Sequence, residues 1–249
     1  GTSGIIMMDR AGRLLTILDK SSGLQDDHVH SFFTDNENGL WLALDNEISR
    51  VEYPSPITFF GEKNGLQGSV NTVCKNRDNL YVGTGNGLYC LETGDKQRKP
   101  SGIFLPVKSF AGTEIFDALS CGDRIILATG KGLNFLSGDR MVPLDTTNTA
   151  WCLTFSSDSS IILAGQSKRI SCYRYNKEQP SVERNPVNII EISEQARTIA
   201  EDNNGTVWVG TDVAKIYKLD FKGDFSKRPD LVMLDTANGV PSIASCVAV

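Results

Sequence analysis

Short runs in which apolar and polar residues alternate make up most of the chain, and clusters of Gly, Asn, Asp and Ser separate them. β-Branched and aromatic residues dominate runs such as residues 79–84 and 206–211, while residues 35–39 and 202–205 are typical of the turns. Alternation over a few residues is typical of a strand, and Asn and Gly tolerate the positive φ of a tight turn. Residues 192–202 come nearest to a helical period, but they align with strand segments elsewhere. The pattern predicts an all-β fold.

Similar segments recur along the chain, each centred on an aromatic or Ile residue in a strand. The centres, Trp41, Tyr81, Ile126, Ile162 and Trp208, follow one another at intervals of about 40 residues, a period typical of four-stranded propeller blades. Before each centre we expect an inner strand, at residues 29–33, 70–75, 115–119, 150–155 and 197–200. The chain starts and ends inside a repeat, so we expect a segment of a longer protein.

The repeats predict a β-propeller over residues 1–249, with about five whole four-stranded blades and a partial blade at each end. We place the repeats at residues 1–22 (partial), 23–63, 64–109, 110–147, 148–192, 193–236 and 237–249 (partial). A blade buries its faces only against its neighbours. We therefore expect Trp41, Tyr81 and Trp208 to be core residues between blades, and loss of Trp41 or Trp208 to Ala to cost about 3–5 kcal/mol.

Composition narrows the function classes. The formal net charge is −5, from 25 Lys and Arg against 30 Asp and Glu, whereas nucleic-acid binding relies on a basic surface. The apolar runs fall far short of the roughly 20 residues that span a bilayer. We expect no nucleic-acid or membrane contact by this segment, and a signal peptide that is absent or removed. The six cysteines form no Cys-x-x-Cys pair and lie in apolar stretches typical of small buried thiols; disulfides remain an alternative.

Candidate catalytic chemistry is sparse. The only histidines, His28 and His30, are spaced to share a strand face with Asp26 or Asp27 nearby, but no further cluster completes a zinc site. We expect polar residues there that face solvent, an axial channel or a ligand, and neither a metal nor another cofactor. No Gly-x-Ser-x-Gly motif occurs, and the glycine-rich residues 83–87 lack the Lys and helix of a phosphate-binding loop. The sequence therefore predicts no catalytic residues and no enzyme.

The loops that enter the inner strands vary while their flanks repeat, as binding loops on a rigid scaffold do. Their carboxylates, amides and hydroxyls suit a polyhydroxylated ligand, because each hydrogen bond contributes about 1 kcal/mol net. The candidate ligand-binding residues are Gln25, Asp26, Asp27, His28, His30, Gln67, Ser69, Glu114, Asn148 and Gln195. Ordinary solvated turns are the alternative.

One motif resembles a known repeat. Gly-Leu-Gln at residues 23–25, then Val29, then the turn at residues 35–39, then Trp41, is similar to the two-component regulator propeller repeat. The motif recurs around Tyr81 and, with Trp-Val-Gly-Thr, at residues 208–211, whereas the repeats around Ile126 and Ile162 are degenerate. The resemblance implies the periplasmic sensor region of a hybrid two-component histidine kinase, many of which sense glycans. It also implies a larger, seven-bladed propeller, followed in the parent protein by a membrane span and a kinase.

These observations together predict a non-catalytic periplasmic sensor fragment. We expect it to bind an oligosaccharide or another small polar ligand, and to help position a second sensor chain. Two alternatives stay open: a propeller lyase or hydrolase that uses His28 and His30, and a purely structural protein-interaction scaffold.

Overall fold

Antiparallel strands joined by short turns make up the computed structural model, which describes residues 4–37, 39–45, 47–52, 60–92 and 102–242. The regular elements of these residues are strands and single-turn 3-10 helices, so the all-β class is confirmed. The chain divides into two compact units, residues 1–59 (unit 1) and residues 60–249 (unit 2). Among the described residues, no helix has the length and apolar character needed to cross a bilayer.

Unit 1 contains a hairpin and a three-stranded sheet. The hairpin pairs β1 (Ile5–Met8) with β2 (Leu14–Leu18), and the sheet has the order β3 (Val29–Thr34), β4 (Gly39–Leu44), β5 (Ile48–Glu52). A 3-10 turn, Lys20–Ser22, follows β2 and ends at Gly23, whose φ of +106° suits glycine. The buried leucines Leu24, Leu40, Leu42 and Leu44 form the core, against Ile5, Leu18, Val29 and Val51.

The first two sheets of unit 2 each contain four antiparallel strands in chain order. One consists of β6 (Val70–Asn76), β7 (Asn79–Thr84), β8 (Gly87–Leu91) and β9 (Phe104–Pro106). The other consists of β10 (Ile115–Cys121), β11 (Arg124–Thr129), β12 (Gly132–Ser137) and β13 (Arg140–Asp145).

The remaining strands of unit 2 form two more sheets, which share the long strand β17. They are β14 (Ala150–Phe155), β15 (Ile161–Asn176), the short β16 (Ser181–Val182), β17 (Asn188–Glu201), β18 (Thr206–Thr211), β19 (Ile216–Asp220) and β20 (Asp230–Leu234). The first half of β15 pairs with β14 and the second half with β17, whose own second half pairs with β18.

β15 turns back on itself rather than running straight. The backbone N–H of Tyr175 donates to the carbonyl of Ser160 at 2.7 Å, whereas a straight strand of that length would separate these groups by roughly 50 Å. Lys168 has a φ of +63° between the two arms, as a tight turn requires. One sheet therefore contains β14, both arms of β15 and the first half of β17. The next contains the second half of β17, then β18, β19 and β20.

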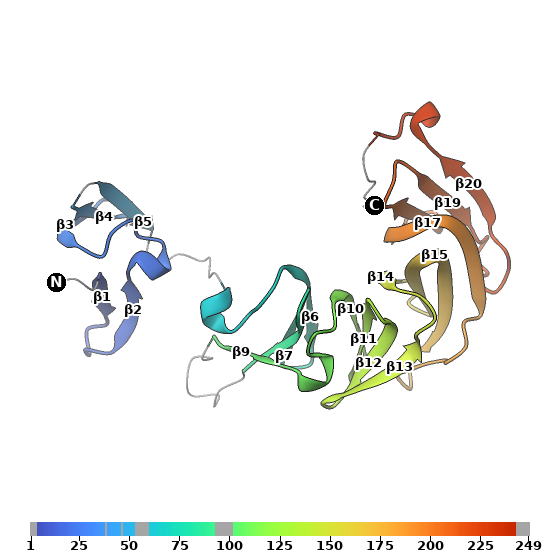
Figure 1. The fold of residues 1–249 in the computed structure, drawn as a ribbon, viewed down its shortest axis with the longest axis horizontal. Helices are drawn as coiled ribbons and strands as arrows, with labels where there is room; N and C mark the ends of the chain where they lie inside the picture. Colours follow the sequence, from blue (N-terminus) through green and yellow to red (C-terminus); the bar gives the residue numbers. More distant parts are fainter. Residues whose placement is uncertain (1–3, 38, 46, 53–59, 93–101, 243–249) are drawn as a thin grey trace. The chain divides into compact units, whose positions relative to one another are not determined.

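The four sheets of unit 2 fan out from their inner strands. Contacts join β6 to β10, β10 to β14 and β14 to β17, while β9, β13 and β20 lie at the outer ends of their sheets (Figure 1). Each pair of neighbouring sheets encloses an apolar cluster. Ile125 and Leu127 of β11 pack into the cluster shared with the preceding sheet, and Ile126 and Ala128 into the one shared with the following sheet. This is the packing of propeller blades, and the predicted fold class is confirmed.

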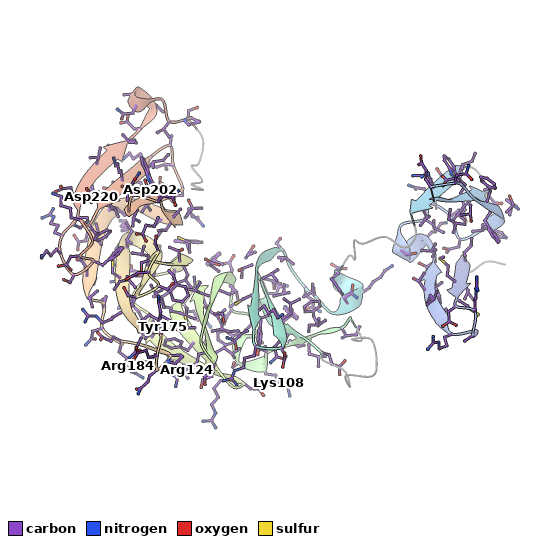
Figure 2. All side chains as sticks on the ribbon, turned by 180° about the vertical axis from the view of Figure 1, so that it is seen from behind. Lys108, Arg124, Tyr175, Arg184, Asp202 and Asp220 are labelled. Carbon is purple, nitrogen blue, oxygen red and sulfur yellow. The ribbon has the colours of Figure 1, made fainter. Side chains whose placement is uncertain are left out.

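The repeat centres differ in burial, which corrects one expectation. Ile126 and Ile162 are fully buried and Tyr81 and Trp208 are partly buried, but Trp41 is 40% exposed in unit 1 and is not a core residue there. Its indole N–H donates to Asp35 in the preceding turn, and Trp208 donates in the same way to Asp202, which lies between β17 and β18 (Figure 2). Each indole N–H thus has a carboxylate acceptor in the turn that precedes its own strand.

The described cysteines are free thiols, buried at Cys74, Cys121, Cys152 and Cys172 and half-buried at Cys90. Burial raises the pKa of Cys121 to about 12, so its reactive thiolate is scarce at neutral pH. These thiols serve as small apolar groups, and Cys246 lies outside the described residues.

Candidate functional site

The inner strand of each sheet carries a β-bulge at the same place. In all five, the pairing register with the second strand shifts after the first residue of the inner segment, so that one residue is left over. We call these five residues the bulge positions: His30, Asn71, Phe116, Trp151 and Arg197. A bulge redirects a side chain and is common beside functional sites. The sequence motif does not reveal it, because bulged and regular strands share the same alternation.

In unit 2 the bulge positions of neighbouring sheets contact one another. The rings of Phe116 and Trp151 have centroids 4.2 Å apart, and the guanidinium carbon of Arg197 lies 3.5 Å from the centroid of the Trp151 ring. Asn71 extends the row by donating from Nδ2 to the carbonyl of Ile115 at 2.8 Å. The result is a row of contacting side chains from three successive sheets that ends in a cation–π pair, with Asn71 bonded to the backbone beside Phe116.

Arg197 keeps a free charge at the end of this row. Its side chain is exposed, and within the described part of the chain none of the ion pairs involves it. The two aromatic residues are partly buried. The row therefore combines apolar surface with a cation that has no carboxylate partner among the residues that the structure describes.

Asp117, directly after the bulge at Phe116, joins three sheets behind the row. Its carboxylate accepts hydrogen bonds from Thr72 Oγ1 at 3.2 Å and from the backbone N–H groups of Ala118 and Leu153, both at 2.8 Å. Burial raises the pKa of Asp117, and these hydrogen bonds oppose that effect. Asp117 thus fixes β6, β10 and β14 relative to one another.

The predicted loop residues of unit 2 lie at equivalent places beside this row. In each sheet the residue that precedes the bulged segment of the inner strand accepts, through its carbonyl, a backbone N–H from the chain that follows the paired segment of the second strand. The pairs are Ser69 with Gly85, Glu114 with Gly130, Thr149 with Ser167 and Gln195 with Asp212. The distances are 2.9–3.2 Å. Four successive sheets therefore present their loops at the same end, which we call the rim.

The predicted side chains lie on successive sheets along the rim, but they do not contact one another through hydrogen bonds. Gln67, Ser69 and Glu114 are exposed, Asn148 and Gln195 are partly buried, and among the described residues no hydrogen bond links the side chains of these five. Gln195 lines a cavity of about 390 Å³ with Lys168, Glu194 and Asp212. Its Oε1 is buried and has no hydrogen-bond partner within the described part of the chain.

In unit 1 the predicted residues lie around the start of β3. Gln25 and His30 are exposed, and Asp26, Asp27 and His28 are partly buried. The structure adds Asp45, which the sequence did not single out: its carboxylate lies 2.5 Å from His30 Nε2 and 3.7 Å from His28 Nδ1. The register pairs Val29 with Leu44, which brings the residues on either side of that pair together. Only the strand pairing could have revealed this contact.

Comparison with known proteins agrees with this architecture. Packed antiparallel sheets that fan out from their inner strands make the chain a β-propeller segment. Residues 191–213, which include the Asp202–Trp208 pair, match the family model of the two component regulator propeller. The resemblance inferred from the sequence is confirmed for this repeat. A search of curated proteins gave no match.

Comparison with solved structures gives matches to two domains from B. thetaiotaomicron. The extracellular domain of BT3049, described as a hybrid two component system, is 16% identical, with a TM-score of 0.50 over 97% of this chain and 33% of its own. The extracellular domain of BT4673, described in the same way, is 17% identical, with a TM-score of 0.47 over 89% of this chain and 30% of its own. The chain thus spans about a third of the length of these domains.

Proposed function

We propose that the chain is a non-catalytic sensor segment, located in the periplasm, of a hybrid two-component histidine kinase. The two component regulator propeller repeat at residues 191–213 supports this class of parent protein. The proposed ligand is an oligosaccharide or a sugar-like polar molecule, bound where the bulge positions meet the rim.

The row formed by Phe116, Trp151 and Arg197 carries this proposal. A sugar ring has an apolar face of C–H groups and a periphery of hydroxyl groups, so it needs an aromatic surface bordered by polar side chains. Phe116 and Trp151 provide the surface, Arg197 provides donors, and Asn148 and Gln195 on the rim add amides. A single aromatic or polar side chain on a surface does not indicate a binding site. Here three neighbouring sheets contribute such side chains to one continuous surface.

A ligand on this row contacts several sheets at once, which suits a sensor. A signal passes only where a ligand has different affinities for two arrangements of the protein. We propose that the second arrangement is a different packing of two sensor chains. Sedimentation velocity of the full periplasmic region, with and without ligand, tests this step. An unchanged association state on saturation would contradict it.

Calorimetry of the full chain against a panel of neutral and uronic-acid oligosaccharides tests the binding site. We expect at least one oligosaccharide to bind, and Trp151→Ala and Arg197→Gln to weaken it about tenfold or more, equal to about 1.4 kcal/mol. Trp151→Phe keeps an aromatic ring and should lose less. The matched control is Arg184→Gln, at an exposed arginine between β16 and β17 (Figure 2).

Two results would count against the proposal. A failure of every oligosaccharide in the panel to bind would favour a purely structural scaffold. Binding that survives Trp151→Ala unchanged would place the ligand elsewhere on the chain.

A further inference from the structure

Two imidazoles and two carboxylates meet at one end of the three-stranded sheet of unit 1. Asp45 presents Oδ1 to His30 Nε2 at 2.5 Å and Oδ2 to His28 Nδ1 at 3.7 Å. Ligand atoms of Asp26, His28 and Asp45 all lie within 4.8 Å of one another. We propose that Asp26, His28, His30 and Asp45 bind a divalent transition-metal ion of the kind that prefers imidazole, such as Zn²⁺, Ni²⁺ or Cu²⁺.

The pairing of β3 with β4 assembles this cluster. Val29 and Leu44 are partners, so His28, just before β3, and Asp45, just after β4, come next in the register. His30 occupies the bulge position of β3, and its ring stacks beside that of His28 with centroids 6.3 Å apart.

The surroundings leave room for a metal ion. The side chains of His28 and His30 are 46% and 60% exposed, so both rings can rotate toward a shared ion without disturbing the core. The carboxylate of Asp26 is held in place by one hydrogen bond, because its Oδ1 accepts the backbone N–H of His28 at 3.0 Å. The nearby cation is Lys20, whose Nζ lies 3.7 Å from Asp26 Oδ2 and is itself exposed. A metal ion would displace this weak contact.

The donor set selects the class of metal. Two imidazole nitrogens with two carboxylate oxygens fit a tetrahedral zinc ion, with bonds of about 2.0–2.2 Å. Imidazole also suits Cu²⁺ and Ni²⁺, and affinity generally rises from Ni²⁺ to Cu²⁺ and falls again at Zn²⁺. Hard ions such as Mg²⁺ and Ca²⁺ prefer oxygen ligands alone. We therefore expect Cu²⁺ to bind most tightly, and Mg²⁺ and Ca²⁺ not to compete.

Isothermal titration calorimetry, in which Zn²⁺ is added to the chelator-treated full chain, tests the site. We expect one ion per chain, with the dissociation constant raised about tenfold or more by Asp45→Asn and by His28→Ala, and binding abolished by His28→Ala with His30→Ala. The matched control is Asp9→Asn in the turn between β1 and β2 of the same unit. Asp9 Oδ1 accepts the backbone N–H groups of Ala11 and Arg13, both at 2.9 Å, which an Asn carbonyl preserves, so this variant should bind normally.

Electron paramagnetic resonance of the Cu²⁺-loaded wild type gives a test that needs no variant. Because His28 and His30 are the only histidines in the chain, hyperfine coupling to imidazole nitrogen would come from this site alone. Zinc affinity that is unchanged in Asp45→Asn or in the double histidine variant would overturn the proposal. A copper spectrum without imidazole coupling would overturn it as well.

Discussion

Single acidic residues in the turns hold the repeat aromatics in place. Asp35 accepts the indole N–H of Trp41 at 2.8 Å and the backbone N–H of Gly39 at 2.7 Å, and Asp202 repeats this arrangement with Trp208 and Thr206. The sequence shows both turns and both tryptophans, so the positions of these residues were predictable. The exposure of Trp41 was not predictable, because the motif indicates that an aromatic ring is present but not how much of the ring other residues cover.

The acid titration of Asp35 tests this arrangement. The Trp41 indole donor, with the backbone donors of the turn and Arg50, lowers the pKa of Asp35 from 3.8 to about 2. Because the pKa of Asp35 is lower in the folded chain than in the unfolded chain, the ionised carboxylate stabilises the fold at any pH above the unfolded-state pKa of 3.8. This stabilisation is lost as the pH falls through the folded-state pKa of about 2.

The indole resonance of Trp41 reports this titration by NMR. At pH 3 a carboxylate with a pKa of 2 is only about one-tenth protonated, so we expect the resonance to stay near its pH 6 position. A shift that is mostly complete by pH 3 would show an ordinary pKa and would contradict the arrangement. Asp35→Asn removes the titrating group and serves as the control.

At the scale of elements, the inner strands were predictable and their details were not. Residues 29–33, 70–75, 115–119 and 150–155 were expected as inner strands and lie in β3, β6, β10 and β14. The expected strand at residues 197–200 is only the second half of β17, because that strand continues from one sheet into the next. Local alternation defines a strand but says nothing about its partner, so neither the sharing of β17 between two sheets nor the bulges could be foreseen.

Asp117 is the element-scale contact most open to test. Its replacement by Ala leaves the backbone N–H of Leu153, a buried residue, without its acceptor, and such a loss costs about 1–3 kcal/mol. We expect a loss of stability of this size in equilibrium urea unfolding. Thr72→Ala removes only the hydroxyl donor and should cost less. Equal stability of Asp117→Ala and wild type would show that the carboxylate does not join the sheets.

At the scale of the whole molecule, the predicted radial packing holds within unit 2. The period of about 40 residues was enough to predict four-stranded sheets stacked side by side, because such sheets bury both faces only against each other. Burial of β11 on both faces is the direct consequence. The candidate site was predictable only in part. The rim loops were proposed from their polar residues, and their part in binding stays a prediction. Phe116, Trp151 and Arg197 could not be proposed from the sequence, because they come together only through bulges in three separate sheets.

The most direct test of this account is the spatial order of those three side chains in solution. We predict nuclear Overhauser effects between the ring protons of Phe116 and Trp151, and between the Trp151 ring and the Arg197 side chain, in selectively labelled protein. Residues 116, 151 and 197 are far apart in the sequence. These signals therefore arise only if the bulge positions of successive sheets bring their side chains into contact. Their absence from well-resolved spectra of the folded chain would contradict the account.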